Sequence, residues 1–518
     1  MSYEPAELGG ADQRVQFSRG ASYLIIQNLG TSAVAVVAFA IMARLISTKE
    51  MGILAILQLV GAACVTFGTW FPQSVTKFVA ENFSRGFKDV AAGAFYQALT
   101  WNLLFCIPVA IVIYVAAPFF ALHLLQDVSY ASLFRVFAFD VFFFEGMLPI
   151  LTAALLGLQM FRETAIVGFV AGLARQSLVI LLLILWRNFI GLPVGWLISD
   201  ALAAIIYLAL TTRMLGSPRF GFSLGKLFRF YLPLEFVSIV SYVKGWFDRA
   251  LLAVFVPLAT LGVYNAAVTA YGVAAGVSFV LYNTLFPVFS SIHMGDKAKL
   301  RDAVRLSTRY ACFVVTFVDL LLLATAKAAL TLFVGDSYVD GSLPLVILCA
   351  ADAITAFATA LGPAFLAMEE TNVVAGVSIV SAVLGLGGAY LLLPMLGTLG
   401  ASIGRASAIL LTGLLEFLVL KKTMRLELDF RAIAKTIAAG AVMVLTVLAV
   451  QMVGYSKFLF PIYAIIGVMA YLLMFRALKV VDSEDLRLLT NYLGKRFHWL
   501  SNILIFILLD HASRDSTQ

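Results

Sequence analysis

The chain has little charge and no long polar stretch. Of its 518 residues, 13% are charged and 62% are hydrophobic, whereas soluble proteins carry roughly 25% charged residues. No polar connection between hydrophobic runs exceeds about twenty residues. This leaves no room for a soluble catalytic domain, so we expect the protein to act within a lipid bilayer.

Residues that bind metals or catalyse reactions are also scarce. The four histidines are scattered, and the sequence has no CxxC spacing, no glycine-rich phosphate loop and no nucleophile paired with a base. The sequence therefore predicts no catalytic residues, no metal site and no cofactor, and a protein that is not an enzyme. The four cysteines all fall in hydrophobic runs and are expected to be packing residues: Cys64, Cys106, Cys312 and Cys349.

Long hydrophobic runs fill the chain instead. A membrane-spanning helix needs about 20 mostly apolar residues, and continuous runs of this length are not the alternating pattern of a β-barrel. The sequence predicts an all-α polytopic membrane protein with about fourteen transmembrane helices. They are placed near 21–46, 51–72, 91–118, 131–158, 164–186, 190–212, 231–256, 261–288, 305–333, 343–367, 372–394, 399–420, 432–454 and 458–478.

The formal net charge of +7 is distributed as a topology signal. With fourteen spans both termini lie on one side, and that side holds 26 lysines and arginines against 6 on the other. Positive residues concentrate on the cytoplasmic side of membrane proteins. We therefore expect a multi-pass protein of the plasma (inner) membrane with both termini in the cytoplasm, and no nucleic-acid partner.

The chain also repeats itself at an offset of 205–215 residues. Gly195 and the helix after it match Gly400 and its helix, which sets Asp200 against Arg405. Each repeat holds six spans, so the two should be parallel and related by a two-fold axis along the membrane normal. The expected parts are a cytoplasmic arm (1–20), an N-terminal six-helix lobe (21–215), a cytoplasmic linker (216–230), a C-terminal six-helix lobe (231–425), two further helices (431–480) and an interfacial amphipathic tail (481–518) that contacts membrane lipids.

Charged residues occur at membrane depth in both repeats. Each costs at least about 2.5–3.5 kcal/mol to insert near the bilayer centre, so they should pair or line a watery cavity. Cations can grip phosphate oxygens, and an arginine does so two at a time. The candidate substrate-binding cations are Arg175, Lys244, Arg249, Arg405 and Arg44. The candidate coupling or pairing acids are Asp140, Glu145, Asp200, Asp248, Asp319 and Asp352.

Some of these charges have plain structural alternatives. Lys244 and Asp248 are four residues apart and can pair on one helix face. Asp248 and Arg249 could instead form buried pairs with a neighbouring helix. Asp200 could serve only as a packing partner of Arg405 across the axis.

Several short motifs, in order, resemble a known family. They are Asp248-Arg249-Ala250-Leu251-Leu252, Leu261-Gly262-Val263-Tyr264-Asn265-Ala266-Ala267 and Leu285-Phe286-Pro287, with Ala43-Arg44-Leu45-Ile46 and Leu332-Phe333-Val334-Gly335-Asp336. Over residues of about 15–500 the chain resembles the polysaccharide biosynthesis proteins. These are oligosaccharide flippases, similar to O-antigen flippases, of the multidrug/oligosaccharidyl-lipid/polysaccharide (MOP) superfamily.

The resemblance implies two six-helix lobes, a central cationic cavity and alternating access. The cargo would be an oligosaccharide linked to a polyprenyl phosphate or pyrophosphate, flipped from the cytoplasmic to the outer leaflet. Other polysaccharide-assembly proteins are possible partners. Arg44, Asp248 and Arg249 stand on motif positions, while Arg175, Lys244 and Arg405 are nominated from charge and depth alone.

Three other functions stay open at this point. An ion-coupled antiporter for drugs or organic cations would need an acid in the first lobe; residues 21–46 contain none, although Asp140, Glu145 and Asp200 could substitute. A membrane glycosyltransferase or polymerase would need longer outer loops than this chain has. A non-transporting scaffold for polysaccharide assembly would not need its buried cations for activity.

Overall fold

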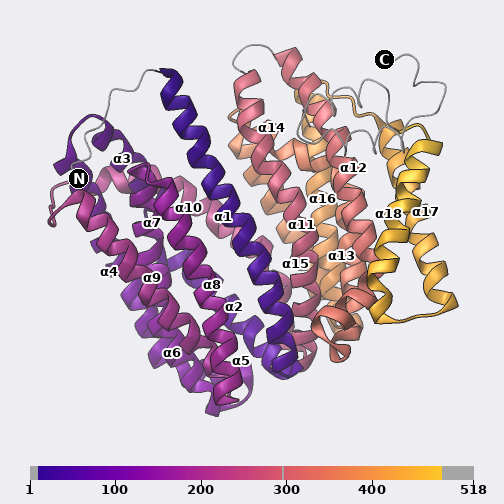
Figure 1. The fold of residues 1–518 in the computed structure, drawn as a ribbon, viewed down its shortest axis with the longest axis horizontal. Coiled ribbons are helices and arrows are strands. Elements are labelled where there is room, and N and C mark those ends of the chain that lie inside the picture. The colour runs from indigo at the N-terminus through magenta and orange to yellow at the C-terminus, as the bar shows by residue number, and fades with distance from the viewer. Residues whose placement is uncertain (1–9, 294–296, 481–518) are drawn as a thin grey trace. The chain divides into compact units, whose positions relative to one another are not determined.

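The protein is helical throughout the part that the structure, a computed structural model, describes. That part is residues 10–293 and 297–480, and no strand occurs in it. Thirteen helical segments are long and apolar enough to cross a membrane, which confirms the predicted all-α polytopic class (Figure 1). The predicted interfacial tail, 481–518, lies outside the described residues.

The seventh predicted span, 231–256, is covered by α10 (Leu224–Phe255). This helix is long enough to cross a membrane but is not among the thirteen. Its charged residues lower its hydropathy, since Glu235, Lys244, Asp248 and Arg249 all lie within it.

The helices fall into two compact units, Met1–Trp246 (unit 1) and Phe247–Gln518 (unit 2). The division lies inside α10, whereas we expected it in the linker 216–230. Leu227 and Tyr231, early in α10, belong to the hydrophobic core of unit 1. Phe247, later in α10, packs with Ala389 and Ala408 of unit 2. One helix thus contributes to the interior of both units.

Unit 1 contains six spanning segments before α10. Five of them are single helices: α1 (Gly10–Leu45), α2 (Thr48–Gly68), α4 (Lys88–Val115), α8 (Phe161–Trp186) and α9 (Gly191–Leu215). The other, which comes between α4 and α8, is a continuous run of α6 (Ala131–Val141), the π-helix η2 (Phe142–Met147) and α7 (Leu148–Gly157). The first helix begins at Gly10, so it extends into the region expected to be an arm.

Two short helices of unit 1 were not predicted. They are α3 (Pro72–Ser84) and α5 (Ala117–Leu125). We expected α3 to be a polar connection, because its exposed face carries charge. Its other face is apolar, and Val75 and Val79 are fully buried with Ile150 and Leu151 of α7. Such a helix is held by packing of one face, which hydropathy alone does not reveal.

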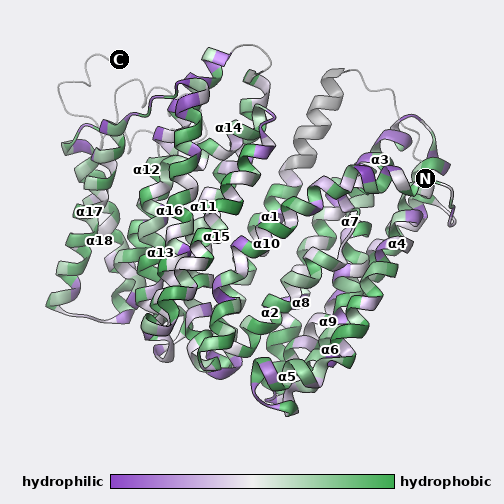
Figure 2. Ribbon diagram, turned by 180° about the vertical axis from the view of Figure 1, so that it is seen from behind, coloured by the Kyte–Doolittle hydropathy of each residue, from purple (hydrophilic) through white to green (hydrophobic). Residues whose placement is uncertain are grey.

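Unit 2 contains α11 (Leu258–His293), α12 (Lys297–Ala329), α13 (Ser342–Thr355), α14 (Leu361–Ala367), α15 (Thr371–Leu396), α16 (Thr398–Met424), α17 (Phe430–Val453) and α18 (Phe460–Ala477). The last two helices pack on α12, where the Tyr471 hydroxyl donates to the Phe313 carbonyl at 2.9 Å. Figure 2 shows that hydrophobic residues dominate the helices of both units.

Two local features recur at matching places in the two units. In unit 1 the span made of α6 and α7 is interrupted by η2, and in unit 2 the span made of α13 and α14 is interrupted by η5 (Ala356–Ala360). Gly195 and Gly400 each let a helix touch the one before it. A Cβ at Gly195 would lie 2.9 Å from the Val179 nitrogen, and one at Gly400 would lie 2.6 Å from the Leu392 carbonyl oxygen.

We expect Gly400→Val to destabilise unit 2, because the added side chain would meet the backbone of α15, which cannot move aside. Overpacking of this kind costs typically 1–3 kcal/mol. Gly387→Val on α15 is the control, since a Cβ there meets nothing within 4 Å. The measurement is the apparent melting temperature of the detergent-solubilised protein; equal melting of both variants would contradict the close packing.

Candidate functional site

An arginine and two aspartates from three helices meet inside unit 1. Arg175 lies on α8, Asp140 on α6 and Asp200 on α9. The Arg175 Nε is 3.2 Å from Asp200 Oδ2, and its Nη2 is 3.8 Å from Asp140 Oδ2. The two aspartate side chains are 1% and 6% exposed, and that of Arg175 is 24% exposed. The guanidinium is therefore engaged on the protein side and partly accessible.

Two aromatic rings hold the same guanidinium. Its central carbon lies 4.6 Å from the ring centre of Phe144 and 4.9 Å from that of Trp196. Arginine stacks on aromatic faces, and a desolvated contact is worth about 2 kcal/mol. The rings and the aspartates together fix the direction of the Arg175 side chain.

A third acid, Glu145, is placed by the π-helix η2. Its side chain is 2% exposed, and its Oε2 accepts a hydrogen bond from the Thr69 hydroxyl at 2.9 Å. The wider turn of a π-helix changes which backbone carbonyls find a partner within the helix. Asn102 supplies two partners here, since its Nδ2 donates to the carbonyls of Glu145 and Gly146 at 3.1 and 2.8 Å.

The charge balance of this cluster favours acids. Asp140, Glu145 and Asp200 surround one arginine, and within the described part of the chain Asp140 Oδ1 has no hydrogen-bond partner. Buried carboxylates that outnumber their cations are costly unless a proton or cation joins them. The cluster can therefore offer both a guanidinium and an excess of carboxylate oxygens.

Unit 2 holds a tighter ion pair. The Asp248 side chain is 0% exposed, and its Oδ2 lies 2.9 Å from Arg405 Nη1 of α16. The Tyr264 hydroxyl of α11 donates to the same oxygen at 2.7 Å, and the Arg249 backbone N–H donates to Oδ1 at 2.8 Å. Asp248 is thus bound on both oxygens, which supports the structural alternative considered for this residue.

Unit 2 also contains a pair of neighbouring acids, Asp319 on α12 and Asp352 on α13. Asp319 is fully buried and faces Asp352, and Tyr271 of α11 lies beside Asp352. Among the described residues, neither carboxylate oxygen of Asp319 has a hydrogen-bond partner. Acids again exceed bases locally.

The candidate cations are divided between the units. Arg44 is exposed in the last turn of α1, and Lys244 is partly buried in the unit 1 part of α10. Arg175 also belongs to unit 1, while Arg249 and Arg405 belong to unit 2. One cavity formed by all five remains a proposal.

Asp200 and Arg405, for which packing against each other was one alternative, each have an ion pair with another residue. Asp200 has its ion pair with Arg175, and Arg405 has one with Asp248. Both matched repeat positions form ion pairs, each within its own unit. Among residues 10–293 and 297–480, no three His, Cys, Asp or Glu side chains form a metal-binding group, and the four cysteines are free and buried.

Several residues of these clusters were missed from the sequence. These residues support the charges but are ordinary residues of hydrophobic stretches: Thr69, Asn102, Phe144, Trp196 and Tyr271. No motif or periodicity marks them. Only the uncharged polar side chain of Asn102, in the middle of an apolar run, could have pointed to a buried hydrogen-bonding role.

Solved structures share this fold. The inward closed lipid II flippase MurJ has a TM-score of 0.65 and 14% identity, covering 88% of this chain and 99% of its own. An inward-facing multidrug resistance MATE family transporter of the MOP superfamily has a TM-score of 0.64 and 15% identity, covering 76% and 94%. A MOP superfamily transporter from Pyrococcus furiosus has a TM-score of 0.55 and 13% identity, covering 79% and 95%.

These likenesses, at low identity, show the fold of the MOP superfamily. A comparison with curated protein sequences finds no match. The model of one family, described as polysaccharide biosynthesis protein, matches residues 17–293, just over half of the chain. The chain therefore belongs to the polysaccharide biosynthesis protein family, as its motifs and its fold together indicate.

Proposed function

We propose that the protein flips a lipid-linked oligosaccharide from the cytoplasmic to the outer leaflet by alternating access. The carrier would be a polyprenyl phosphate or pyrophosphate. The observation that carries the proposal is a guanidinium held within the spans of each unit, Arg175 in unit 1 and Arg405 in unit 2. Both are fixed by buried aspartates and keep partly exposed side chains, so they can meet phosphate oxygens.

The membrane potential supports this direction of transport. A head group with two negative charges that crosses the full field gains about 4.6 kcal/mol on export at an inside-negative potential of about 100 mV. The nearby acids offset part of the attraction for an anionic head. They also prevent the head from being bound too tightly to leave.

The acid excess favours a second candidate, an ion-coupled antiporter for drugs or organic cations. Three acids surround Arg175, and Asp319 and Asp352 form a pair of neighbouring acids in unit 2, of which Asp319 is fully buried. Carboxylates that outnumber bases suit a proton, a sodium ion or a cationic substrate. Both candidate functions use the same clusters of charged residues, and they differ in whether the cargo is negatively or positively charged.

The test is translocation of a lipid-linked oligosaccharide in proteoliposomes, with wild type and Arg405→Lys. Lysine keeps a positive charge beside Asp248 but loses the planar fork that grips two phosphate oxygens, and we expect the rate to fall at least tenfold, about 1.4 kcal/mol. Arg187→Lys, at an exposed arginine after α8, is the matched control. Failure of folded wild type to translocate, together with proton- or sodium-driven efflux of an organic cation, would favour the antiporter.

A further inference from the structure

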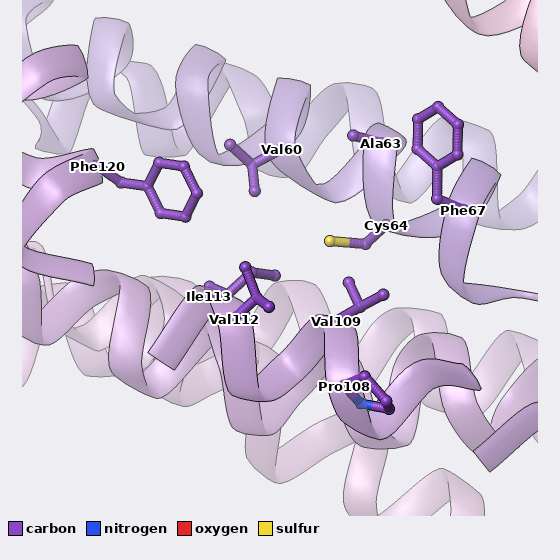
Figure 3. Close-up of a pocket in the computed structure, with 9 residues that line it drawn as sticks. All are labelled: Val60, Ala63, Cys64, Phe67, Pro108, Val109, Val112, Ile113 and Phe120. Atoms are coloured by element: carbon purple, nitrogen blue, oxygen red, sulfur yellow. The ribbon is translucent and has the colours of Figure 1, made fainter. Parts of the chain in front are cut away.

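Unit 1 contains an apolar groove between α2 and α4. Its cavity volume is about 330 Å³. Figure 3 shows side chains of α2 along one side and those of α4 along the other, with Phe120 of α5 at one end and Phe67 at the other. The Cys64 thiol is the most polar group that lines it, and no charged side chain does. The groove is elongated and excludes ionic ligands.

The mouth of the groove is at the surface of unit 1. Phe67 is 50% exposed and Val112 is 58% exposed. Both side chains are hydrophobic and lie on helices that are long and apolar enough to cross a membrane, so the rim of the groove is apolar as well. A helix with its side chains is about 10–12 Å wide, which is too bulky for a cavity at the small end of ligand pockets. A single hydrocarbon chain fits this shape.

The groove runs close to the charged cluster. Thr69, which binds Glu145, follows Phe67 of the groove by two residues and comes directly after the end of α2. Asn102, which binds the same π-helix, precedes Pro108 of the groove by about 9 Å. Phe144, next to Glu145, stacks on Arg175. The segment after α2 and the helix α4 therefore supply hydrogen-bond partners of η2, while α2 and α4 line the groove.

We propose that this groove holds the polyisoprenoid chain of the transported lipid while its phosphate meets Arg175. The inference rests on the proposed function. A phosphate at Arg175 is covalently joined to its chain, so the chain must start within a few bonds of the guanidinium and needs apolar surroundings there. The groove supplies these apolar surroundings next to the cluster of Arg175, Asp140, Asp200 and Glu145. An ordinary phospholipid, whose head stays at the membrane surface, has no such reason to lie at this depth.

The first test is photocrosslinking in phospholipid vesicles. The probe is a polyprenyl phosphate with a benzophenone on its isoprenoid chain, compared with a phosphatidylcholine that carries benzophenone on an acyl chain. We expect adducts on α2 or α4 peptides from the first probe, suppressed by unlabelled polyprenyl phosphate and not by phosphatidic acid. Equal adducts from both probes, or none on these helices, would overturn the proposal.

The second test fills the groove. Val112→Trp should lower the polyprenyl adduct and the translocation of a long-chain substrate about tenfold, and leave a short-chain analogue with the same head unaffected. Ile111→Trp is the matched control, since Ile111 is 55% exposed on the same helix and does not line the groove. Ala63→Leu, a smaller change in the α2 wall, replaces Val112→Trp if that variant misfolds.

The two proposals can fail separately. Crosslinking reports occupancy of the groove whether or not the protein transports the lipid. Wild type that crosslinks on α2 and α4 but does not translocate would count against the flippase and leave the groove assignment intact. Translocation that Val112→Trp does not change, with unchanged adducts, would overturn the groove alone.

Discussion

Arg175→Ala is expected to abolish transport and to destabilise unit 1 strongly. The change leaves Asp140 and Asp200, 1% and 6% exposed, without their arginine. Removal of one partner from a buried ion pair typically costs about 3–5 kcal/mol, and the stacking on Phe144 and Trp196 is lost as well. The measurements are apparent melting temperature in detergent and translocation in proteoliposomes.

A combined variant separates folding from transport. Arg175→Met together with Asp140→Asn and Asp200→Asn removes the positive charge and both negative ones, so most of the stability should return. Transport should stay lost if the guanidinium binds the phosphate. Recovery of transport in this variant would show that Arg175 only neutralises its aspartates. Arg175→Lys should keep part of the stability, because it retains charge but loses the planar fork.

Arg405→Met is expected to be the most destabilising single change in unit 2. It leaves the fully buried carboxylate of Asp248 without its ion pair, at a cost of about 3–5 kcal/mol. Tyr264 and the Arg249 backbone N–H would still donate to Asp248, which limits the loss. Apparent melting temperature checks the result.

An exposed ion pair provides the control for this experiment. Lys457 pairs with Asp336 at 2.5 Å, with side chains 29% and 73% exposed, and Lys457→Met should cost at most about 1 kcal/mol. Adding Asp248→Asn to Arg405→Met should restore most of the lost stability. A similar effect of the Lys457 and Arg405 variants would mean that the Asp248 pair is not desolvated in the membrane.

Most of the fold could be predicted, because each membrane-spanning helix is a long run of hydrophobic residues in the sequence. Each of the fourteen predicted runs overlaps a helical segment of the structure. The short helix α3 was not predicted, because only one of its faces packs against the core. The π-helix η2 was not predicted, because a π-helical turn has no distinctive hydropathy. The division inside α10 could not be predicted either, since it depends on where Leu227 and Phe247 pack.

The charged residues of the candidate site could be predicted from the sequence, but the ion pairs that they form could not. The cost of a charge at membrane depth singled out Arg175, Asp200 and Arg405. Which acid meets which base depends on the neighbours of each helix, and the sequence did not show that Asp200 pairs with Arg175 or that Arg405 pairs with Asp248. The aromatic support of Arg175 was hidden because Phe144 and Trp196 are unremarkable in an apolar run.

The helix α10, which contributes to both units, also determines where the chain can be split into two separately expressed polypeptides. A gene cut just before α10, within 216–223, would place Leu227 and Tyr231, which belong to the core of the first unit, on the second polypeptide. The first fragment would then lack part of its core until the second supplied the missing helix. Complementation between such fragments would be obligatory, because α10 contributes to the cores of both units.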